Sequence, residues 1–162
     1  MGKFAFMSSN TITVIIPAFN EEKSIGRVLQ SIPKNLVNHI IVVNNNSTDR
    51  TADVAKNAGA IVLNEYRRGY GWACLKGIEH SKKLQSDIVV FMDGDYSDYP
   101  EEIDKVLAPI LESGYDMVIG SRVLGKRERG SLTPQQRFGN WLATRLIRIV
   151  YKAKYTDLGP FR

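Results

Sequence analysis

Residues 87–98 read DIVVFMDGDYSD, an apolar run that passes directly into an aspartate-rich segment. Apolar, β-branched residues over this length predict a buried strand. Carboxylates at the end of such a strand are costly to desolvate, and a divalent cation that bridges Asp93 and Asp95 to a diphosphate would relieve that cost. Gly94 between them lets the backbone approach a ligand closely. The stretch therefore predicts a metal and diphosphate site, with a ligand-free Asp-rich turn as the alternative.

Similar apolar runs occur elsewhere in the chain, at residues 11–17, 39–43, 60–63 and 116–120. Patterns typical of helices lie between and after them, at residues 21–32, 49–58, 70–84 and 100–111. Strands that alternate with helices at these lengths predict an α/β fold with a mostly parallel sheet flanked by helices. Ligands bind at the carboxyl ends of the strands in such sheets, so the residues after each run are candidates for function.

The residues after the first two runs suit a nucleoside. Pro17, Phe19 and Glu21 offer a tight turn, an aromatic face and a carboxylate, although a proline-stopped strand before an acidic helix start explains them equally well. Residues 44–49, NNNSTD, offer amides and hydroxyls for a base or ribose. Alone, that segment is more typical of a turn in which Asp49 caps the next helix.

Cations follow the later runs. Residues 67–73, RRGYGWA, place two arginines and two glycines directly before a helix, where backbone N–H groups can cradle a phosphate. A flexible connector is the alternative there. Arg122 follows the run at 116–120, and Arg137 follows a polar stretch. Each could be a surface charge, but beside a diphosphate site both become candidate anion clamps.

Composition limits the class of protein. The chain has 162 residues, 43% of them apolar and 24% charged, which predicts one globular domain over 1–162. The net charge of +5 favours anionic partners, but the basic residues do not cluster with exposed aromatics, which argues against nucleic acid. Cys74 is the only cysteine, and no apolar stretch is long enough to span a membrane. We expect a cytoplasmic protein.

The last 40 residues differ in character. Residues 124–136 are polar and charged, which predicts a mobile loop, and a helix is expected over 137–152. Its basic residues recur at spacings of three and four, so they share one face that could rest on an anionic membrane: Arg145, Arg148 and Lys152. A core-packed helix with a solvated basic side is the alternative. Because the chain stops within an expected loop, we expect the domain to be C-terminally incomplete.

Seven motifs, in order, carry a resemblance to a known family: PAFNEE, VVNNNSTDRT, RRGYGWA, MDGDYSDYPE, VIGSR, QQRFGN and TDLGPFR. Together, over residues 12–162, they resemble family-2 glycosyltransferases of the GT-A fold, especially the polyprenyl-phosphate sugar transferases related to dolichol-phosphate mannose synthase. The chain departs from the usual pattern at Asn44 and Asn45, where acids are common, and at Ser97, where glutamine is common.

The resemblance implies an inverting, Mg²⁺- or Mn²⁺-dependent enzyme. It would move a sugar from a UDP- or GDP-linked donor to a polyprenyl or dolichyl phosphate at the inner face of a membrane. The nucleotide-sugar site would consist of Pro17, Phe19, Glu21, Val43, Asn45, Asp93, Gly94 and Asp95. Asp93 and Asp95 would hold the metal, and Arg122 and Arg137 would face the acceptor phosphate.

A lipid-phosphate acceptor is already ionised, so we assign no catalytic base. Asp95 and Arg122 would act as electrostatic stabilisers of the departing diphosphate. Two alternatives stay open. One is a family-2 enzyme that acts on a saccharide hydroxyl and takes its base from a later segment. The other is a non-catalytic nucleotide-binding module.

Overall fold

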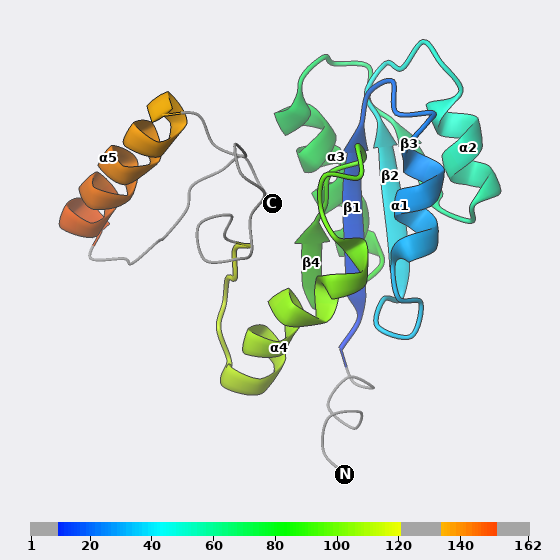
Figure 1. Cartoon of the computed structure of the whole chain (residues 1–162). Coiled ribbons are helices and arrows are strands. Elements are labelled where there is room, and N and C mark those ends of the chain that lie inside the picture. Colours follow the sequence, from blue (N-terminus) through cyan, green and yellow to red (C-terminus); the bar gives the residue numbers. More distant parts are fainter. Residues whose placement is uncertain (1–9, 121–133, 152–162) are drawn as a thin grey trace. The chain divides into compact units, whose positions relative to one another are not determined.

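The computed structural model describes residues 10–120 and 134–151, and the chain divides into two compact units, Met1–Asp116 and Met117–Arg162. The first unit contains the sheet and most of the helices (Figure 1). Its elements in chain order are β1 (Ile12–Ala18), α1 (Ile25–Ser31), β2 (His39–Asn44), α2 (Thr51–Asn57), β3 (Ile61–Asn64), α3 (Tyr70–Lys83), β4 (Ile88–Phe91), the short 3₁₀-helix η1 (Pro100–Glu102) and α4 (Ile103–Ser113). The second unit contributes α5 (Pro134–Tyr151).

The sheet is parallel throughout, with strand order β3-β2-β1-β4. The first four predicted strands are confirmed, and so is the α/β class with helices around a parallel sheet. Because all four strands point the same way, the segments after Ala18, Asn44, Asn64 and Phe91 emerge at one edge. We call this the carboxyl edge.

The predicted strand at residues 116–120 is wrong. The structure has no strand there, and Met117 and Ile119 are exposed. An apolar run becomes a strand only where its backbone finds a partner for its N–H and C=O groups, and the sequence pattern does not contain that information.

The sheet has an apolar layer on each of its two faces. The side chains of β1 alternate between them, so that Val14 and Ile16 face α1, α2 and α4 while Ile15 faces α3. All seven residues of β1 are buried, as expected for a central strand covered on both faces. Figure 1 shows α1 and α2 side by side, and the methyl of Val54 lies close to Gly26 where the two helices meet.

Helix α3 lies unusually close to β1. A Cβ atom at Gly77 would stand 2.4 Å from Cγ2 of Ile15, a side chain with no exposed surface. Only glycine allows this approach without displacing the core. The close packing fixes the position of α3, whose first turn reaches the carboxyl edge.

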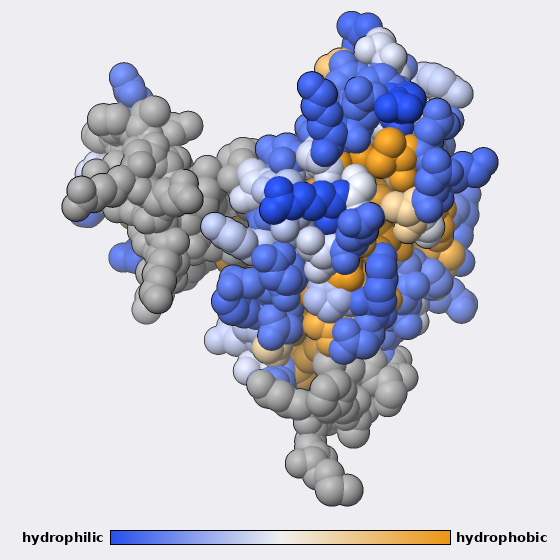
Figure 2. Space-filling view, turned by 45° about the vertical axis from the view of Figure 1, so that its right-hand side comes forward, coloured by the Kyte–Doolittle hydropathy of each residue, from blue (hydrophilic) through white to orange (hydrophobic). Residues whose placement is uncertain are grey.

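The surface of the first unit is mainly hydrophilic on the face shown in Figure 2, with apolar residues visible in strips between the polar ones. Within the described ranges, no helix is both long and apolar enough to cross a membrane. In the second unit, α5 begins at Pro134, three residues before its predicted start. The last three residues of the loop expected over 124–136 are therefore helical. Its other residues, 124–133, lie outside the described residues.

Candidate nucleotide-binding site

The loops after β1 and β2 are joined by hydrogen bonds at the carboxyl edge. The backbone N–H of Asn20 donates to the Ser47 hydroxyl at 3.0 Å, and the Asn20 side-chain oxygen accepts the Thr48 backbone N–H at 2.8 Å. The Glu21 backbone N–H donates to the Thr51 hydroxyl at 2.7 Å. The positive φ of 58° at Asn20 is one that asparagine tolerates better than most residues.

Asp49 was predicted to cap α2, but the N-cap residue is Arg50, which makes no side-chain cap hydrogen bond, so that prediction is wrong. Asp49 lies one residue earlier. Its carboxylate accepts hydrogen bonds from the backbone N–H and the hydroxyl of Thr51 and from the backbone N–H of Glu22, the last at 3.1 Å. Burial alone would raise the pKa of Asp49, but the hydrogen bonds from Thr51 and Glu22 outweigh it and lower that pKa. Asp49 therefore serves the structure of the loop rather than a ligand.

Three consecutive asparagines hold the loop after β3. The Asn44 amide donates to the Asn64 side chain at 2.9 Å, and the Asn46 amide donates to the Tyr66 carbonyl at 2.8 Å. Asn45 is only 8% exposed and makes three hydrogen bonds with residues 65–69. The three asparagines thus join the end of β2 to the end of β3 and the loop after it by hydrogen bonds.

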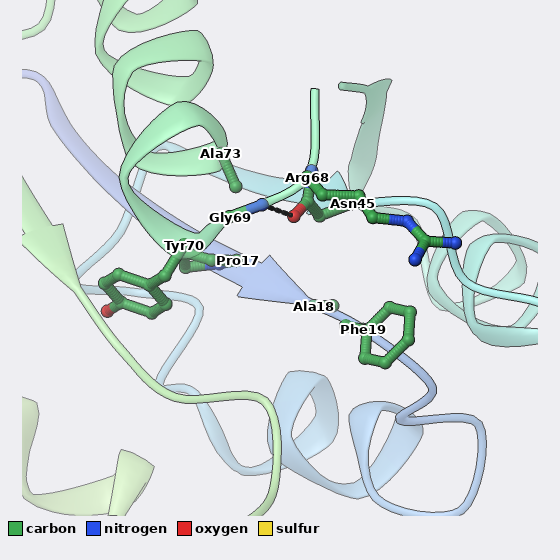
Figure 3. A pocket seen from close by; sticks show the side chains of 8 residues that line it. All are labelled: Pro17, Ala18, Phe19, Asn45, Arg68, Gly69, Tyr70 and Ala73. Atoms are coloured by element: carbon green, nitrogen blue, oxygen red, sulfur yellow. Dashed lines mark hydrogen bonds between the residues drawn. The ribbon is translucent and has the colours of Figure 1, made fainter. Parts of the chain in front are cut away.

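A cavity of about 380 Å³ opens at this edge. Its lining comes from the end of β1, from Asn45, and from the start of α3 with the residues before it: Pro17, Ala18, Phe19, Asn45, Arg68, Gly69, Tyr70 and Ala73. In Figure 3, Phe19 and Tyr70 lie on either side of the strand end, and Arg68 extends on the side of Phe19. Phe19 is 56% exposed, so its ring is available for stacking against a planar ligand.

The two arginines before α3 have different environments. The Arg67 guanidinium pairs with the buried Glu65 carboxylate at 2.8 Å and stacks 3.9 Å from the centre of the Trp72 ring. Hydrogen bonds from the Arg67 side chain and backbone lower the pKa of Glu65 to about 2. In the described part of the chain Arg68 has no ion pair, and it lines the cavity. Arg68 is therefore the cation available to an anionic ligand there.

The Asp93–Asp95 turn is held from several sides. The Asp93 backbone N–H donates to the Asp98 carboxylate at 3.2 Å, and the Ser97 backbone N–H donates to the Asp95 carboxylate at 2.8 Å. Gly94 is buried, with the Glu21 side chain 3.5 Å from the position that a Cβ would occupy. The turn therefore lies directly beside the loop after β1.

Tyr70 lines the cavity and is close enough to Asp93 for the two groups to interact electrostatically. Burial raises the pKa of its hydroxyl, and nearby Cys74 and Asp93 raise it further. The Cys74 thiol, which hydrogen-bonds Tyr70, has its pKa raised by burial and also by Asp93. One wall of the cavity and the first aspartate of the turn thus lie within electrostatic reach of each other.

The donor set of the turn suits a hard divalent cation. Asp93 is half-buried and Asp95 is exposed, so two carboxylates can meet an ion from solvent. Among the described residues no group of three or more His, Cys, Asp or Glu side chains is arranged to hold a metal. The protein would supply a minority of the ligands, as is usual where Mg²⁺ is shared with phosphate oxygens and water.

The structure brings some of the predicted site residues together and not others. Pro17, Phe19 and Asn45 line the cavity, whereas Val43 is fully buried and packs in the apolar layer on the α3 side. Glu21 is not in the lining; its carboxylate accepts the Ser24 hydroxyl at 2.6 Å.

The structure does not show where the side chains of the two predicted arginines, Arg122 and Arg137, lie. Arg122 lies outside the described residues, and Arg137 lies in α5 with its side chain outside the description. Ala18 was not among the predicted site residues, nor were the four lining residues around the start of α3: Arg68, Gly69, Tyr70 and Ala73. The signal that pointed to those four was the RRGYGWA segment itself, with its cations and glycines before a helix.

Comparisons with known proteins agree with this geometry. Residues 13–161 match the family model described as glycosyl transferase family 2. The chain is 32% identical over 152 residues to the low-salt glycan biosynthesis hexosyltransferase Agl6 of Haloferax volcanii, covering 91% of this chain and 36% of that one. It is 29% identical to the UDP-N-acetylglucosamine–dolichyl-phosphate N-acetylglucosaminyltransferase of Methanococcus voltae, covering 83% and 61%.

Among solved structures, the chain is similar to glucosyl-3-phosphoglycerate synthase of Mycobacterium tuberculosis in complex with Mn²⁺, UDP-glucose and phosphoglyceric acid. The TM-score is 0.71 at 28% identity, with 93% of this chain and 54% of that one covered. The chain spans about half the length of the first curated relatives it matches. The parallel sheet, the cavity at its carboxyl edge and the family match over nearly the whole length agree, and the chain belongs to glycosyl transferase family 2.

Proposed function

We propose that this chain is the donor-binding part of a metal-dependent, inverting hexosyltransferase that takes a sugar from a UDP-sugar and passes it to a polyprenyl phosphate. The observation that carries the proposal is the juxtaposition at the carboxyl edge. An aromatic and cationic cavity and a two-carboxylate turn both adjoin the end of β1 and the loop that follows it. A nucleoside diphosphate has the matching parts: a planar base, and a diphosphate that binds both arginine and metal.

The base would stack on Phe19, and Arg68 would bind a base oxygen or a phosphate. No aspartate or glutamate lines the cavity in the described part of the chain. Guanine presents several N–H donors on one edge and is best held by a carboxylate, whereas uracil presents one N–H donor and two carbonyl acceptors. The lining therefore favours uridine, in keeping with the UDP-glucose bound by the mycobacterial relative.

Asp93 and Asp95 would hold Mg²⁺ or Mn²⁺ against the diphosphate. When bound, the cation supplies positive charge that stabilises the departing nucleoside diphosphate. Asp98 keeps the turn in place by accepting the Asp93 backbone N–H. The carboxylates would thus be oriented before the ligand arrives, which is the condition for electrostatic stabilisation at low reorganisation cost.

The residues proposed to bind the acceptor phosphate are Arg122 and Arg137, on the resemblance of their motifs to the family. A phosphate oxygen is already ionised and needs no general base, so orientation and charge stabilisation carry the reaction. The dolichyl-phosphate substrate in the name of the Methanococcus voltae relative supports this acceptor class. The small phosphorylated acceptor bound by the mycobacterial synthase supports the second candidate, a transferase that acts on a soluble acceptor.

A lipid acceptor requires contact with a membrane, and α5 has suitable features. Its exposed apolar residues are Trp141, Leu142, Leu146, Ile149 and Val150. Arg145 and Arg148 lie on the same helix, and the Arg145 guanidinium is 5.7 Å from the Trp141 ring centre. Apolar and basic residues on one helix match an anionic bilayer surface, where each cation contributes about 1 kcal/mol. We therefore propose peripheral contact with the inner face of a membrane.

Isothermal titration of the chain with UDP and GDP, each with Mn²⁺ or with EDTA, tests the donor assignment. We expect UDP with Mn²⁺ to bind most tightly, UDP with EDTA more weakly, and GDP more weakly than UDP under both conditions. Equal affinity for the two nucleotides would contradict the uridine assignment. Binding that does not respond to Mn²⁺ would contradict the metal site.

A further inference from the structure

The side chain of Asn45 uses nearly all of its hydrogen-bonding capacity on one loop. Its amide nitrogen donates to the Glu65 carbonyl at 2.9 Å and to the Arg67 carbonyl at 2.7 Å. Its oxygen accepts the Gly69 backbone N–H at 2.9 Å. Both amide hydrogens are therefore engaged within the protein, and neither is left for a nucleotide.

The loop held in this way carries two residues of the cavity lining, Arg68 and Gly69. Gly69 has φ 128°, a conformation that favours glycine, and it immediately precedes α3. Arg68 lies between the last two contacts of Asn45, because one is to the Arg67 carbonyl and the other to the Gly69 N–H. The path of the backbone at Arg68 is thus set by Asn45.

We propose that Asn45 is a positioning residue, which fixes Arg68 and the start of α3 for the nucleotide, and that an amide is required there because it donates twice and accepts once. This inference rests on the proposed function. A carboxylate would keep the contact to the Gly69 N–H but would place a negative oxygen 2.7–2.9 Å from two carbonyl oxygens that now accept hydrogen bonds. The Arg67 carbonyl would lose its Asn45 donor, and the Glu65 carbonyl would keep only the longer contact from the Asn46 amide at 3.4 Å. Repulsion between the oxygens and the lost hydrogen bonds would therefore shift the loop.

The chain supplies a matched control one residue earlier. Asn44 donates to the Asn64 side chain at 2.9 Å and accepts the Ser47 backbone N–H at 3.1 Å. An aspartate at 44 keeps the second contact, and the Asn64 amide can turn to donate to it. Asn44→Asp and Asn45→Asp therefore make the same chemical change and add the same charge near the cavity, but only the second removes donors from the loop.

The experiment is UDP titration in the presence of Mn²⁺ for wild type, Asn44→Asp, Asn45→Asp, Arg68→Ala and the double variant Asn45→Asp/Arg68→Ala. We expect Asn45→Asp to weaken UDP roughly tenfold or more and Asn44→Asp to weaken it less than about threefold. Because Asn45 acts through Arg68, its replacement should cost much less in the Arg68→Ala background. Equal losses in the two aspartate variants, or full additivity with Arg68→Ala, would overturn the proposal.

A pH series distinguishes positioning from general damage. An aspartate at 45 would be buried and would face two carbonyl oxygens, and both effects raise the pKa of a carboxyl group. A protonated aspartate can donate one hydrogen bond, so the affinity of Asn45→Asp relative to Asn44→Asp should recover in part as the pH is lowered from 8 to about 4.5. Position 45 contacts the backbone carbonyls of two charged residues, Glu65 and Arg67, and lines the cavity together with Arg68. All three charged residues are present in both variants. If Asn45→Asp does not fold, Asn45→Ser, which has one neutral donor, replaces it in the same cycle. A ratio independent of pH in the folded aspartate variant would refute the donor requirement, whereas failure of the wild type to bind UDP would instead refute the proposed function.

Discussion

Replacement of Gly77 by alanine tests how closely α3 lies on β1. The added Cβ would stand 2.4 Å from Cγ2, 3.1 Å from Cδ1 and 3.3 Å from Cγ1 of Ile15. Ile15 is fully buried in a central strand whose seven residues are all buried, so its side chain cannot move out into solvent. Overpacking of this kind costs roughly 1–3 kcal/mol, and the removal of a glycine from a helix returns about 1 kcal/mol.

The net effect expected for Gly77→Ala is a loss of up to ~2 kcal/mol in the free energy of unfolding. Gly71→Ala is the matched control on the same helix, since a Cβ there meets no atom within 4 Å. It should leave stability unchanged or raise it by up to ~1 kcal/mol. Urea unfolding followed by circular dichroism measures both. Equal stability of the two variants would show that α3 does not approach β1 as closely as described.

Four further outcomes are expected. Asp95→Asn should reduce UDP affinity in Mn²⁺ to the level measured in EDTA, and titration that still responds to Mn²⁺ would contradict its role as a ligand. Phe19→Ala should weaken UDP but leave pyrophosphate nearly unaffected, because the ring is placed for the base; equal weakening of both would contradict that placement. The pKa of Glu65 is lowered to about 2, so its carboxylate contributes stability that is fully present above pH 4.5 and lost as the pH falls toward 2; Glu65→Gln should be less stable at pH 7 and lose less on acidification, as acid titration of unfolding would measure. The chain should sediment with anionic liposomes at low salt, and sedimentation should fail after glutamine replaces three cations: Arg145, Arg148 and Lys152.

Much of the fold could be predicted because the strands carry an unambiguous signal. The buried runs that became β1 and β2 are apolar and β-branched almost throughout, and the helices between them require a parallel arrangement. The run at 116–120 has the same composition but no strand partner in the structure. Composition reports the tendency of a segment to be buried, whereas pairing depends on what lies beside it in space.

The site was predicted less completely for a related reason. Phe19 and Pro17 follow a strand directly, so their place at the carboxyl edge follows from the topology. Glu21 lies only two residues further along, but its backbone N–H binds Thr51 and its carboxylate binds Ser24, which hold it away from the cavity. Such local hydrogen bonds depend on loop conformations that spacing alone does not reveal.

The role of Asn45 could not be anticipated from residue type. An amide after a strand can hydrogen-bond a base, a ribose or a neighbouring backbone equally well. Only the structure shows that the Asn45 side chain bonds the backbone. Arg67 and Arg68 are likewise indistinguishable in sequence, but one is paired with Glu65 and the other lines the cavity.

The ties between the loops of the carboxyl edge have a thermodynamic consequence. The loops after β1, β2 and β3 are joined in a row by Asn20, Asn45 and their neighbours, so this side of the cavity is ordered before any ligand arrives. A ligand that enters the cavity does not have to immobilise those segments. The conformational entropy that a binding loop usually loses on binding is here lost already when the protein folds. Calorimetry on UDP should accordingly show a small conformational entropy penalty, and variants that cut these ties should bind with a more unfavourable entropy even where the enthalpy of the remaining contacts is unchanged.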